Sequence, residues 1–480
     1  MARPSIVVVG GGISGLAAAW ELSGGASGPT TNTPRVELIE MGSRFGGVLA
    51  TTDFAGRTID LGADGFLARR PEATELVREL GIDDQLEPIA ASGASLWLRG
   101  ALNEIPAGLA LGVPTSSSSL ASLPGLSRTA RLHARRDELF PKRLDVGDDA
   151  TIGKIVRTKL GDELAYQFIE PMVGGIQAGR IDQLSAKSVF PALLDAARQG
   201  GSLMKAMRPK GPVNLGPRGA TNASGPMFYS LLGGMGSLPV ELVRQLEQRG
   251  VVLRRGVRVT ALRRSGSGDY RWEVDTANTT TPADALVLAT PAPVTGQLIG
   301  QFDPALEALG TVTSAGAAMV SLSLARSDVT LPAHGTGVLV PLGTSWSGEG
   351  SMMVTAITFL DRKWPHLYQE SNVLLRAHVG RIDDRRWASL EDQELIERVS
   401  RELRVVLAAF GSPSDAMVQR WPEGLPQYLV GHDRLVASAK AAGTPLHVAL
   451  AGSAYDGVGI PASIGSGRRA AREALDFLSV

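Results

Sequence analysis

A glycine-rich turn near residue 10 has the residue types and the spacing of a dinucleotide site. Gly10, Gly12 and Gly15 form the pattern G-x-G-x-x-G. The first glycine turns the chain off a strand, the second lets the backbone approach a pyrophosphate, and the third lets helix and strand pack closely. The helix that follows would point free N–H groups and its positive dipole end at the phosphates. The residues expected to contact the dinucleotide here are Gly10, Gly11, Gly12, Ile13, Ser14 and Gly15.

Glu40 is the next residue with suitable chemistry. It ends a predicted strand at 35–40, the place where a carboxylate accepts hydrogen bonds from a ribose. Its separation from Gly10 exceeds the usual spacing of about 20 residues. A loop at 23–34, rich in Gly, Ser, Thr and Pro, explains the difference. The pattern therefore predicts a dinucleotide site rather than a plain turn.

The elements that would position these residues form a strand–helix–strand unit. A β-branched apolar run predicts a strand at 6–9. A second strand is predicted at 35–40, with a helix at 16–22 between the two. The stretch 209–226, rich in Gly, Pro and Asn, is predicted to be a mobile connector. Together with the remaining patterns, this predicts an α/β chain. Further strands are expected at 251–262, 270–275, 285–289, 317–325 and 447–451, and helices at 71–81, 151–168, 389–410 and 465–478.

The composition excludes several other kinds of site. The 480-residue chain has no cysteine, which rules out disulfides, thiolate nucleophiles, Cys-ligated metals and a cysteinyl link to a cofactor. Its 48 basic and 48 acidic residues balance, so no nucleic-acid partner is expected. The six histidines lack metal-ligand spacing, so no metal site is predicted. Without a bilayer-spanning apolar run or a targeting peptide ahead of the first strand, a cytoplasmic location is expected.

Four segments in the same order resemble those of FAD-dependent amine-oxidase-like flavoproteins. Residues 40–47 fit E-x-x-x-R-x-G-G, whose arginine and glycines hold the pyrophosphate, and 60–66 fit a segment whose backbone passes along the flavin. Residues 251–259 resemble the adenine-binding strand, and 451–460 the C-terminal motif whose helix N-terminus faces the flavin pyrimidine. The resemblance implies noncovalent FAD, with Asp64 contacting it through its backbone. It adds as cofactor-binding residues Met41, Arg44, Gly47, Val48, Gly62, Ala63, Asp64, Gly65, Val259, Trp421, Gly452, Gly457, Val458, Gly459 and Ile460.

The middle of the chain is similar to oxygen-dependent protoporphyrinogen oxidases of bacteria. The similar segments are 102–108, 171–185, 228–235 and 421–432, the last fitting W-x-x-x-x-P-Q-Y-x-x-G-H. The resemblance implies oxidation of protoporphyrinogen IX to protoporphyrin IX by three hydride transfers to flavin N5, with O2 reduced to H2O2 in haem biosynthesis. Flavin would carry the chemistry, and no definite acid or base is predicted. The residues implied to position substrate are Gly175, Tyr229 and Leu231.

Alternatives of different classes stay open. Coproporphyrinogen III oxidation to coproporphyrin III would need a more basic site, because this substrate carries four propionates rather than two. Arg99, Arg180 and Arg208 are candidates to bind propionates. A flavin amine oxidase commonly has a lysine near flavin N5, but no lysine lies between Lys210 and Lys363. A non-enzymatic lipid binder like the GDP-dissociation inhibitors would not need intact FAD motifs.

The resemblance implies a discontinuous domain organisation with a Rossmann-like FAD-binding fold. Residues 1–70, 225–300 and 440–480 would form the FAD-binding domain, and 71–90, 207–224 and 301–439 a mixed-sheet substrate-binding domain. Residues 91–206 would form a helical insertion. The uncharged flank 105–127 of that insertion is predicted to rest peripherally on the cytoplasmic membrane. Handover of product to the next haem-pathway enzyme is expected by analogy only.

Overall fold

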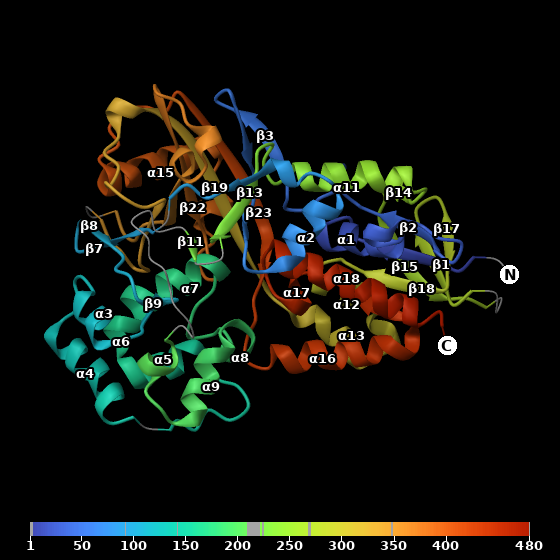
Figure 1. The fold of residues 1–480 in the computed structure, drawn as a ribbon, viewed down its shortest axis with the longest axis horizontal. Coiled ribbons are helices and arrows are strands. Elements are labelled where there is room, and N and C mark those ends of the chain that lie inside the picture. Colours follow the sequence, from blue (N-terminus) through green and yellow to red (C-terminus); the bar gives the residue numbers. More distant parts are fainter. Residues whose placement is uncertain are drawn as a thin grey trace.

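The structure, a computed structural model, consists of two large sheets and a helical lobe (Figure 1). It describes residues 3–91, 93–141, 143–208, 221–222, 225–266, 270–346 and 349–479. Most of the connector predicted at 209–226 lies outside these residues. The α/β class predicted from the sequence is confirmed.

A five-stranded parallel sheet contains the first strand of the chain. Its order is β14–β2–β1–β18–β24, so β1 lies between a strand that follows it closely and one far along the chain. The register pairs Val9 with both Ile39 and Leu288, which brings the carboxyl ends of three strands to one edge. Ligands bind at such a switch point of open α/β sheets. The strands are β1 (Ser5–Val9), β2 (Arg35–Ile39), β14 (Val252–Arg254), β18 (Ala285–Leu288) and β24 (Val448–Leu450).

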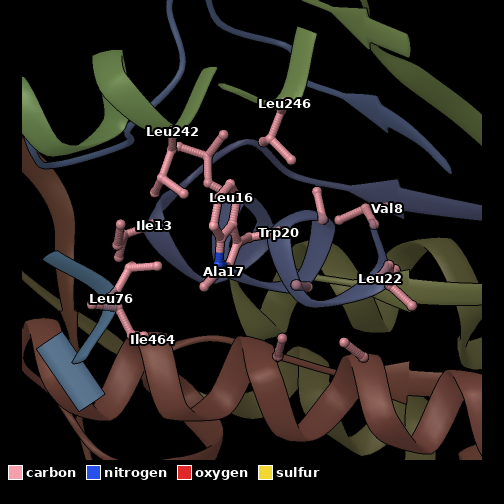
Figure 2. Close-up of a cluster of buried hydrophobic side chains, with 14 of the residues drawn as sticks. Val8, Ile13, Leu16, Ala17, Trp20, Leu22, Leu76, Leu242, Leu246 and Ile464 are labelled. Carbon is pink, nitrogen blue, oxygen red and sulfur yellow. The ribbon is translucent and has the colours of Figure 1, made fainter. Parts of the chain in front are cut away.

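Four helices bury one face of this sheet. Their apolar side chains form a core around Leu16 and Trp20 (Figure 2). Leu76 belongs to the same core, so the helix at 71–79 packs here. Ile89, at the other end of the segment 71–90 that the sequence assigned to the substrate-binding part, packs with Trp364 and Leu374 instead. The helices are α1 (Ile13–Leu22), α2 (Pro71–Glu79), α11 (Ser237–Gln248) and α18 (Ile460–Asp476).

Smaller elements cover the opposite face. A second core joins the sheet to a three-stranded antiparallel sheet and three helices, with Trp272 fully buried in it. These elements are β15 (Val259–Arg264), β16 (Trp272–Thr276), β17 (Thr280–Ala283), α12 (Ala292–Ile299), α13 (Pro304–Glu307) and α16 (His432–Gly443). Because both faces are covered, the strands of the parallel sheet carry apolar runs and not alternating polar residues.

The second large sheet has seven strands, and every neighbouring pair is antiparallel except β20 with β7. Helix α15 (Asp392–Leu407) packs its apolar side on one face. Residues 95–104 belong to this sheet, which corrects their assignment to the helical insertion. In spatial order the strands are β23 (Asp415–Pro426), β19 (Ser314–Ala325), β22 (Asn372–Val379), β21 (Val354–Phe359), β20 (Gly337–Leu339), β7 (Ser95–Leu98) and β8 (Ala101–Glu104).

The helical lobe has a core of its own. It includes Leu120, Leu123 and Val113 as buried residues. The uncharged flank 105–127 therefore supplies some core side chains, and the membrane contact predicted for it stays a prediction. The helices are α3 (Ser117–Ser122), α4 (Arg128–Leu139), α5 (Ile152–Leu160), α6 (Asp162–Leu164), α7 (Glu170–Gln177), α8 (Ala186–Val189), α9 (Pro191–Gln199) and α10 (Leu203–Ala206), with one π-helical turn at Ala165–Ile169.

Short elements connect these parts. Strand β13 pairs antiparallel with both β5 and β6 and joins residues far apart in the chain.

Within the described ranges, no helix combines the length and the apolar character needed to cross a bilayer. The remaining elements are β3 (Thr51–Phe54), β4 (Arg57–Asp60), β5 (Phe66–Leu67), β6 (Leu86–Pro88), β9 (Leu109–Ala110), β10 (Val113–Pro114), β11 (Thr221–Asn222), β12 (Gly225–Pro226), β13 (Phe228–Leu231), α14 (Leu360–Lys363) and α17 (Ser453–Asp456).

Candidate functional site

Each glycine of the turn between β1 and α1 has a distinct structural reason. Gly10 has φ +105°, and an added Cβ would lie 2.6 Å from the Ala289 carbonyl oxygen. A Cβ on Gly15 would lie 1.9 Å from the Gly10 carbonyl oxygen, so the helix could not pack this close to the turn. A Cβ on Gly12 would meet nothing within 4 Å. The protein itself thus leaves Gly12 open, as the approach of a pyrophosphate requires.

Glu40 fixes the geometry around this turn. Its carboxylate accepts hydrogen bonds from the backbone N–H of Gly11 at 2.6 Å and of Gly42 at 2.5 Å. A carboxylate has acceptor capacity beyond two hydrogen bonds, so Glu40 can still accept from a ribose. Helix α1 has no side-chain cap on its N-terminus and no acidic residue in its first turn. Its first N–H groups are therefore available to an anion.

The loop after Glu40 closes over the turn. Arg44 donates to the carbonyl oxygens of Gly47 at 2.6 Å and Leu49 at 3.1 Å. A Cβ on Gly47 would lie 3.2 Å from the Gly12 Cα, so the two backbones face each other. Met41 and Val48 keep 56% and 41% of their surface exposed beside this turn. Apolar side chains left uncovered next to a dinucleotide turn fit an FAD that would cover them.

The C-terminal motif supplies a second open helix N-terminus. Gly459 precedes α18, which begins at Ile460 without a side-chain cap or an acidic residue in its first turn. Gly452 and Gly457 also have positive φ angles, of 131° and 120°. A Cβ on Gly467 would lie 2.1 Å from the Ser14 carbonyl oxygen, so glycine allows α18 to pack tightly on α1.

The W-x-x-x-x-P-Q-Y-x-x-G-H motif braces this region. The Tyr428 hydroxyl donates to the Ser453 carbonyl oxygen, and His432 Nε2 lies 2.8 Å from the Ala454 carbonyl oxygen. Their rings stack with centroids 4.4 Å apart. Gln427 donates to the Gln177 carbonyl oxygen at 2.8 Å, which ties the helical lobe to the same brace. The motif positions the C-terminal segment through its backbone.

The backbone segment 60–65 is held by the second sheet. Arg376, almost fully buried, donates to the carbonyl oxygens of Asp60 and of Gly62, the latter at 3.3 Å. Trp421 donates its indole N–H to the Leu61 carbonyl oxygen at 2.9 Å. Trp421 is predicted to bind the cofactor, but its one polar atom, the indole nitrogen, is hydrogen-bonded to segment 60–65. Ala63 is exposed.

Asp64 has a role that the sequence did not predict. Its carboxylate forms an ion pair with Lys363 Nζ at 2.8 Å and accepts from the Trp364 indole at 3.1 Å. Burial would raise the pKa of Asp64, but Lys363 and Arg376 outweigh this and hold it well below its ordinary value. The charge of Lys363 is therefore neutralised by Asp64. The two residues are too far apart in the sequence for a local pattern to predict their pairing.

One row of side chains on the seven-stranded sheet is only half buried. We call it the sheet row; it crosses five strands and consists of Leu339, Ala356, His378, Met319 and Gln419. Their neighbours on the opposite face, such as Ala377 and Val379, are buried under α15. The row shares its face with Arg376 and Trp421, two residues away along β22 and β23. It therefore lies next to segment 60–65.

Helix α7 faces the end of this row. Gly175 is exposed, and an added Cβ would have only Leu339 Cδ2, at 3.8 Å, within 4 Å. Tyr229 is half buried, with its ring 6.2 Å from that of Phe66. Leu231 is fully buried in the core around Trp20. Its predicted role in touching substrate is thereby corrected, because its side chain has no accessible surface.

The other predicted residues are placed as follows. Val259 begins β15 and pairs with Thr276. Arg180 forms ion pairs with Glu170 at 2.8 Å and Asp383 at 2.6 Å, so its charge is already neutralised. Arg99 lies in the turn between β7 and β8, and Arg208 follows α10 in the helical lobe; their side chains stay 68% and 53% exposed. In the part of the chain that the structure describes, no cluster of His, Asp or Glu could hold a metal ion.

The glycines of the turn provide a test with a built-in control. Gly12→Val should abolish FAD retention and leave the apoprotein about as stable as the wild type, because the new side chain meets no protein atom near its Cβ. Gly15→Val should instead destabilise the fold itself, through the clash with the Gly10 carbonyl oxygen. Flavin absorbance per protein and apoprotein melting temperatures distinguish the two. Full FAD retention by Gly12→Val would contradict the assignment of the open side of the turn.

Asp60 predicts a pH dependence of stability. Burial, and then the charge of Asp64, raise the pKa of the Asp60 carboxyl to about 7, against opposing effects of Arg376 and of the Met235 N–H. Between the ordinary value of about 4 and pH 7 the native state holds a proton that the unfolded chain has lost. Stability should therefore fall as pH rises through this window. Asp60→Asn, which keeps the acceptor for Met235, should flatten the change in urea midpoint between pH 5 and pH 8; an unchanged slope would refute this.

Comparison with known proteins agrees with this geometry. Residues 13–475 match the family described as flavin containing amine oxidoreductase. The chain is 32% identical over 99% of both chains to coproporphyrinogen III oxidase of Bacillus subtilis (strain 168), and 34% identical over 98% of both to that of Mycobacterium leprae (strain TN). A crystal structure from Exiguobacterium sp. 255-15, provisionally assigned as a protoporphyrinogen oxidase, superposes with a TM-score of 0.84 at 29% identity, covering both chains fully. The chain belongs to the flavin-containing amine oxidoreductases.

Proposed function

We propose that this flavin-dependent oxidoreductase, of the porphyrinogen oxidase type, converts coproporphyrinogen III to coproporphyrin III. The observation that carries the proposal is the half-buried sheet row, which lies between segment 60–65 and the open glycine of α7. Relatives more than 30% identical over nearly the whole chain bear this name. They favour coproporphyrinogen III over protoporphyrinogen IX, which the sequence motifs alone suggested.

The reaction removes six hydrogens from the macrocycle in three equal steps. In each step the macrocycle gives up one hydride from a methylene bridge and one proton. Over the three steps each of the four bridges loses one hydrogen and two of the four pyrrole nitrogens lose theirs, so one of the three protons leaves the fourth bridge by tautomerisation. Bound FAD would accept the hydride and pass the electrons to O2, which with the released proton gives H2O2. The residues that would hold FAD are those of the glycine turn, Glu40 and the N-terminus of α18, since each leaves open polar groups.

The chain's own residues would bind, orient and exclude water. Arg376 and Trp421 fix the carbonyl groups of segment 60–62 and so set its position against the sheet row. Lys363 and Asp64 neutralise each other, so neither offers a free acid or base. The apolar members of the row, Leu339, Ala356 and Met319, suit contact with the apolar face of a macrocycle.

Protoporphyrinogen IX is the second candidate. It is favoured by the structural likeness to the Exiguobacterium chain and by the motifs at 171–185 and 228–235. The test is anaerobic mixing of the holoenzyme with each porphyrinogen while flavin bleaching is followed. Faster bleaching by coproporphyrinogen III supports the proposal and faster bleaching by protoporphyrinogen IX supports the alternative. Bleaching by neither would refute both.

Gly175 offers a graded test of the substrate's place. Gly175→Phe should retain FAD and lower the rate of flavin reduction at least tenfold, because a large side chain would enter the space in front of Leu339. Gly175→Ala should have a small effect, since its Cβ reaches only ordinary contact distance. The readouts are flavin content and stopped-flow flavin reduction. Wild-type rates in Gly175→Phe would place substrate elsewhere.

We also propose that the protein contacts a membrane peripherally through α4. This helix lies at the outer edge of the helical lobe (Figure 1). Leu132, Leu139 and Phe140 are 59%, 67% and 70% exposed. Arg135 and Arg136 are also exposed, and have no ion-pair partner within the described ranges. Exposed apolar and basic side chains on one helix suit an anionic bilayer surface.

Vesicle sedimentation tests this surface. The protein should sediment with vesicles containing phosphatidylglycerol and less with pure phosphatidylcholine. Arg135→Glu/Arg136→Glu should abolish the difference. The control, Arg401→Glu/Arg404→Glu, makes the same charge change at exposed positions on α15 and should bind as the wild type does. Equal loss in both variants, or no binding by the wild type, would exclude α4 as a membrane surface.

A further inference from the structure

His378 stands out among the groups that the reaction described above does not use. On β22, residues 373, 375, 377 and 379 are buried under α15, while Arg376 and His378 point to the opposite face. Arg376 reaches segment 60–62. His378, two residues further along the strand, is half buried at the middle of the sheet row. The register of β22 therefore places the imidazole of His378 beside segment 60–65.

The hydrogen bonds of His378 leave one ring nitrogen open. Nε2 lies 3.2 Å from the Thr358 hydroxyl on the neighbouring strand. Nδ1 has no hydrogen-bond partner among the residues described. Met319 and Ala356, its neighbours in the row, are apolar and offer it none. A polar atom in an apolar row requires a partner from outside the protein, either water or a ligand.

The ring is neutral at physiological pH. Burial first, and then the positive charge of Arg376, lower the pKa of His378 to about 4, with Lys363 acting in the same direction and Asp64 opposing. These are the charged groups that face it. A neutral imidazole has one donor and one acceptor nitrogen. If Nε2–H donates to Thr358, Nδ1 is left as an acceptor.

We propose that His378 Nδ1 accepts a hydrogen bond from a pyrrole N–H of the porphyrinogen. The proposal rests on the proposed function. Pyrrole N–H groups are neutral donors, and a neutral acceptor pairs with them without the cost of a buried charge. The hydrogen bond strengthens as hydride leaves, because positive charge then develops on the pyrrole.

The same contact distinguishes substrate from product. A porphyrinogen has tetrahedral bridge carbons, so its pyrroles tilt and can turn an N–H toward one face. A porphyrin is flat, and its N–H groups point to the centre of the ring. His378 therefore binds the reduced macrocycle and loses its partner once aromatisation is complete.

Two amide substitutions separate the two nitrogens of the ring. His378→Asn places an amide near the position of Nδ1, and His378→Gln places one near Nε2, next to Thr358. His378→Phe removes both polar atoms at similar size. FAD content and melting temperature of each holoenzyme show whether the fold and the cofactor site are intact. Binding is measured anaerobically by calorimetry on dithionite-reduced enzyme, which cannot turn over, with coproporphyrinogen III and separately with coproporphyrin III.

His378→Phe and His378→Gln should bind the porphyrinogen about tenfold more weakly, as the loss of one hydrogen bond predicts. Their affinity for the flat porphyrin should be unchanged, and His378→Asn should recover most of the porphyrinogen affinity. Equal weakening for both ligands, or wild-type affinity in His378→Phe, would overturn the role of His378 and leave the proposed function standing. If the wild type binds no porphyrinogen and its flavin is not bleached by one, the proposed function fails instead.

Discussion

The buried guanidinium of Arg376 is the interaction on which the arrangement of the site depends. A charge buried in a sheet is costly unless polar groups surround it. Here the Asp60 and Gly62 carbonyl oxygens provide two of those groups. The charge of Arg376 also lowers the pKa of the nearby Asp60 and Asp64 carboxyl groups. The second sheet can bury Arg376 only while segment 60–62 sits against it. Arg376 thereby fixes segment 60–62 and the sheet row relative to each other.

Other side chains around the site likewise form hydrogen bonds with backbone groups. Trp421 binds the Leu61 carbonyl, Tyr428 and His432 bind those of Ser453 and Ala454, and Glu40 binds two backbone N–H groups. A neutral backbone that must approach a ligand closely cannot carry large side chains, as the environment of Gly12 shows. Its rigidity has to come from residues behind it. Many residues of the recognisable motifs therefore hold the backbone segments that are expected to contact FAD.

The sequence predicted the parts of the site that depend on local geometry. Gly10, Gly12 and Gly15 occupy the expected turn, because strand, turn and helix are contiguous in the chain. The pairing of Asp64 with Lys363 could not be found in this way, since the fold alone brings them together. Segment 105–127 contributes to a core that its lack of charge could not reveal, because a run without charges looks the same whether it faces lipid or protein.

His378 was missed for a different reason. The histidines were judged by metal-ligand spacing, whereas the useful signal was the alternation along 372–379. Polar residues at 376 and 378 interrupt an otherwise apolar strand at every second position. Leu231 shows the converse: its motif predicted contact with substrate, but the strand turns its side chain into the core.

The close packing of α18 on α1, which Gly467 allows, has a consequence for biosynthesis. The glycine turn is synthesised well before β24 and α18, which complete the sheet edge and the second helix N-terminus. Until then β18 has an unpaired edge and α1 lacks its main helical neighbour. The sheet edge that carries the glycine turn is consequently complete only after α18 has been synthesised.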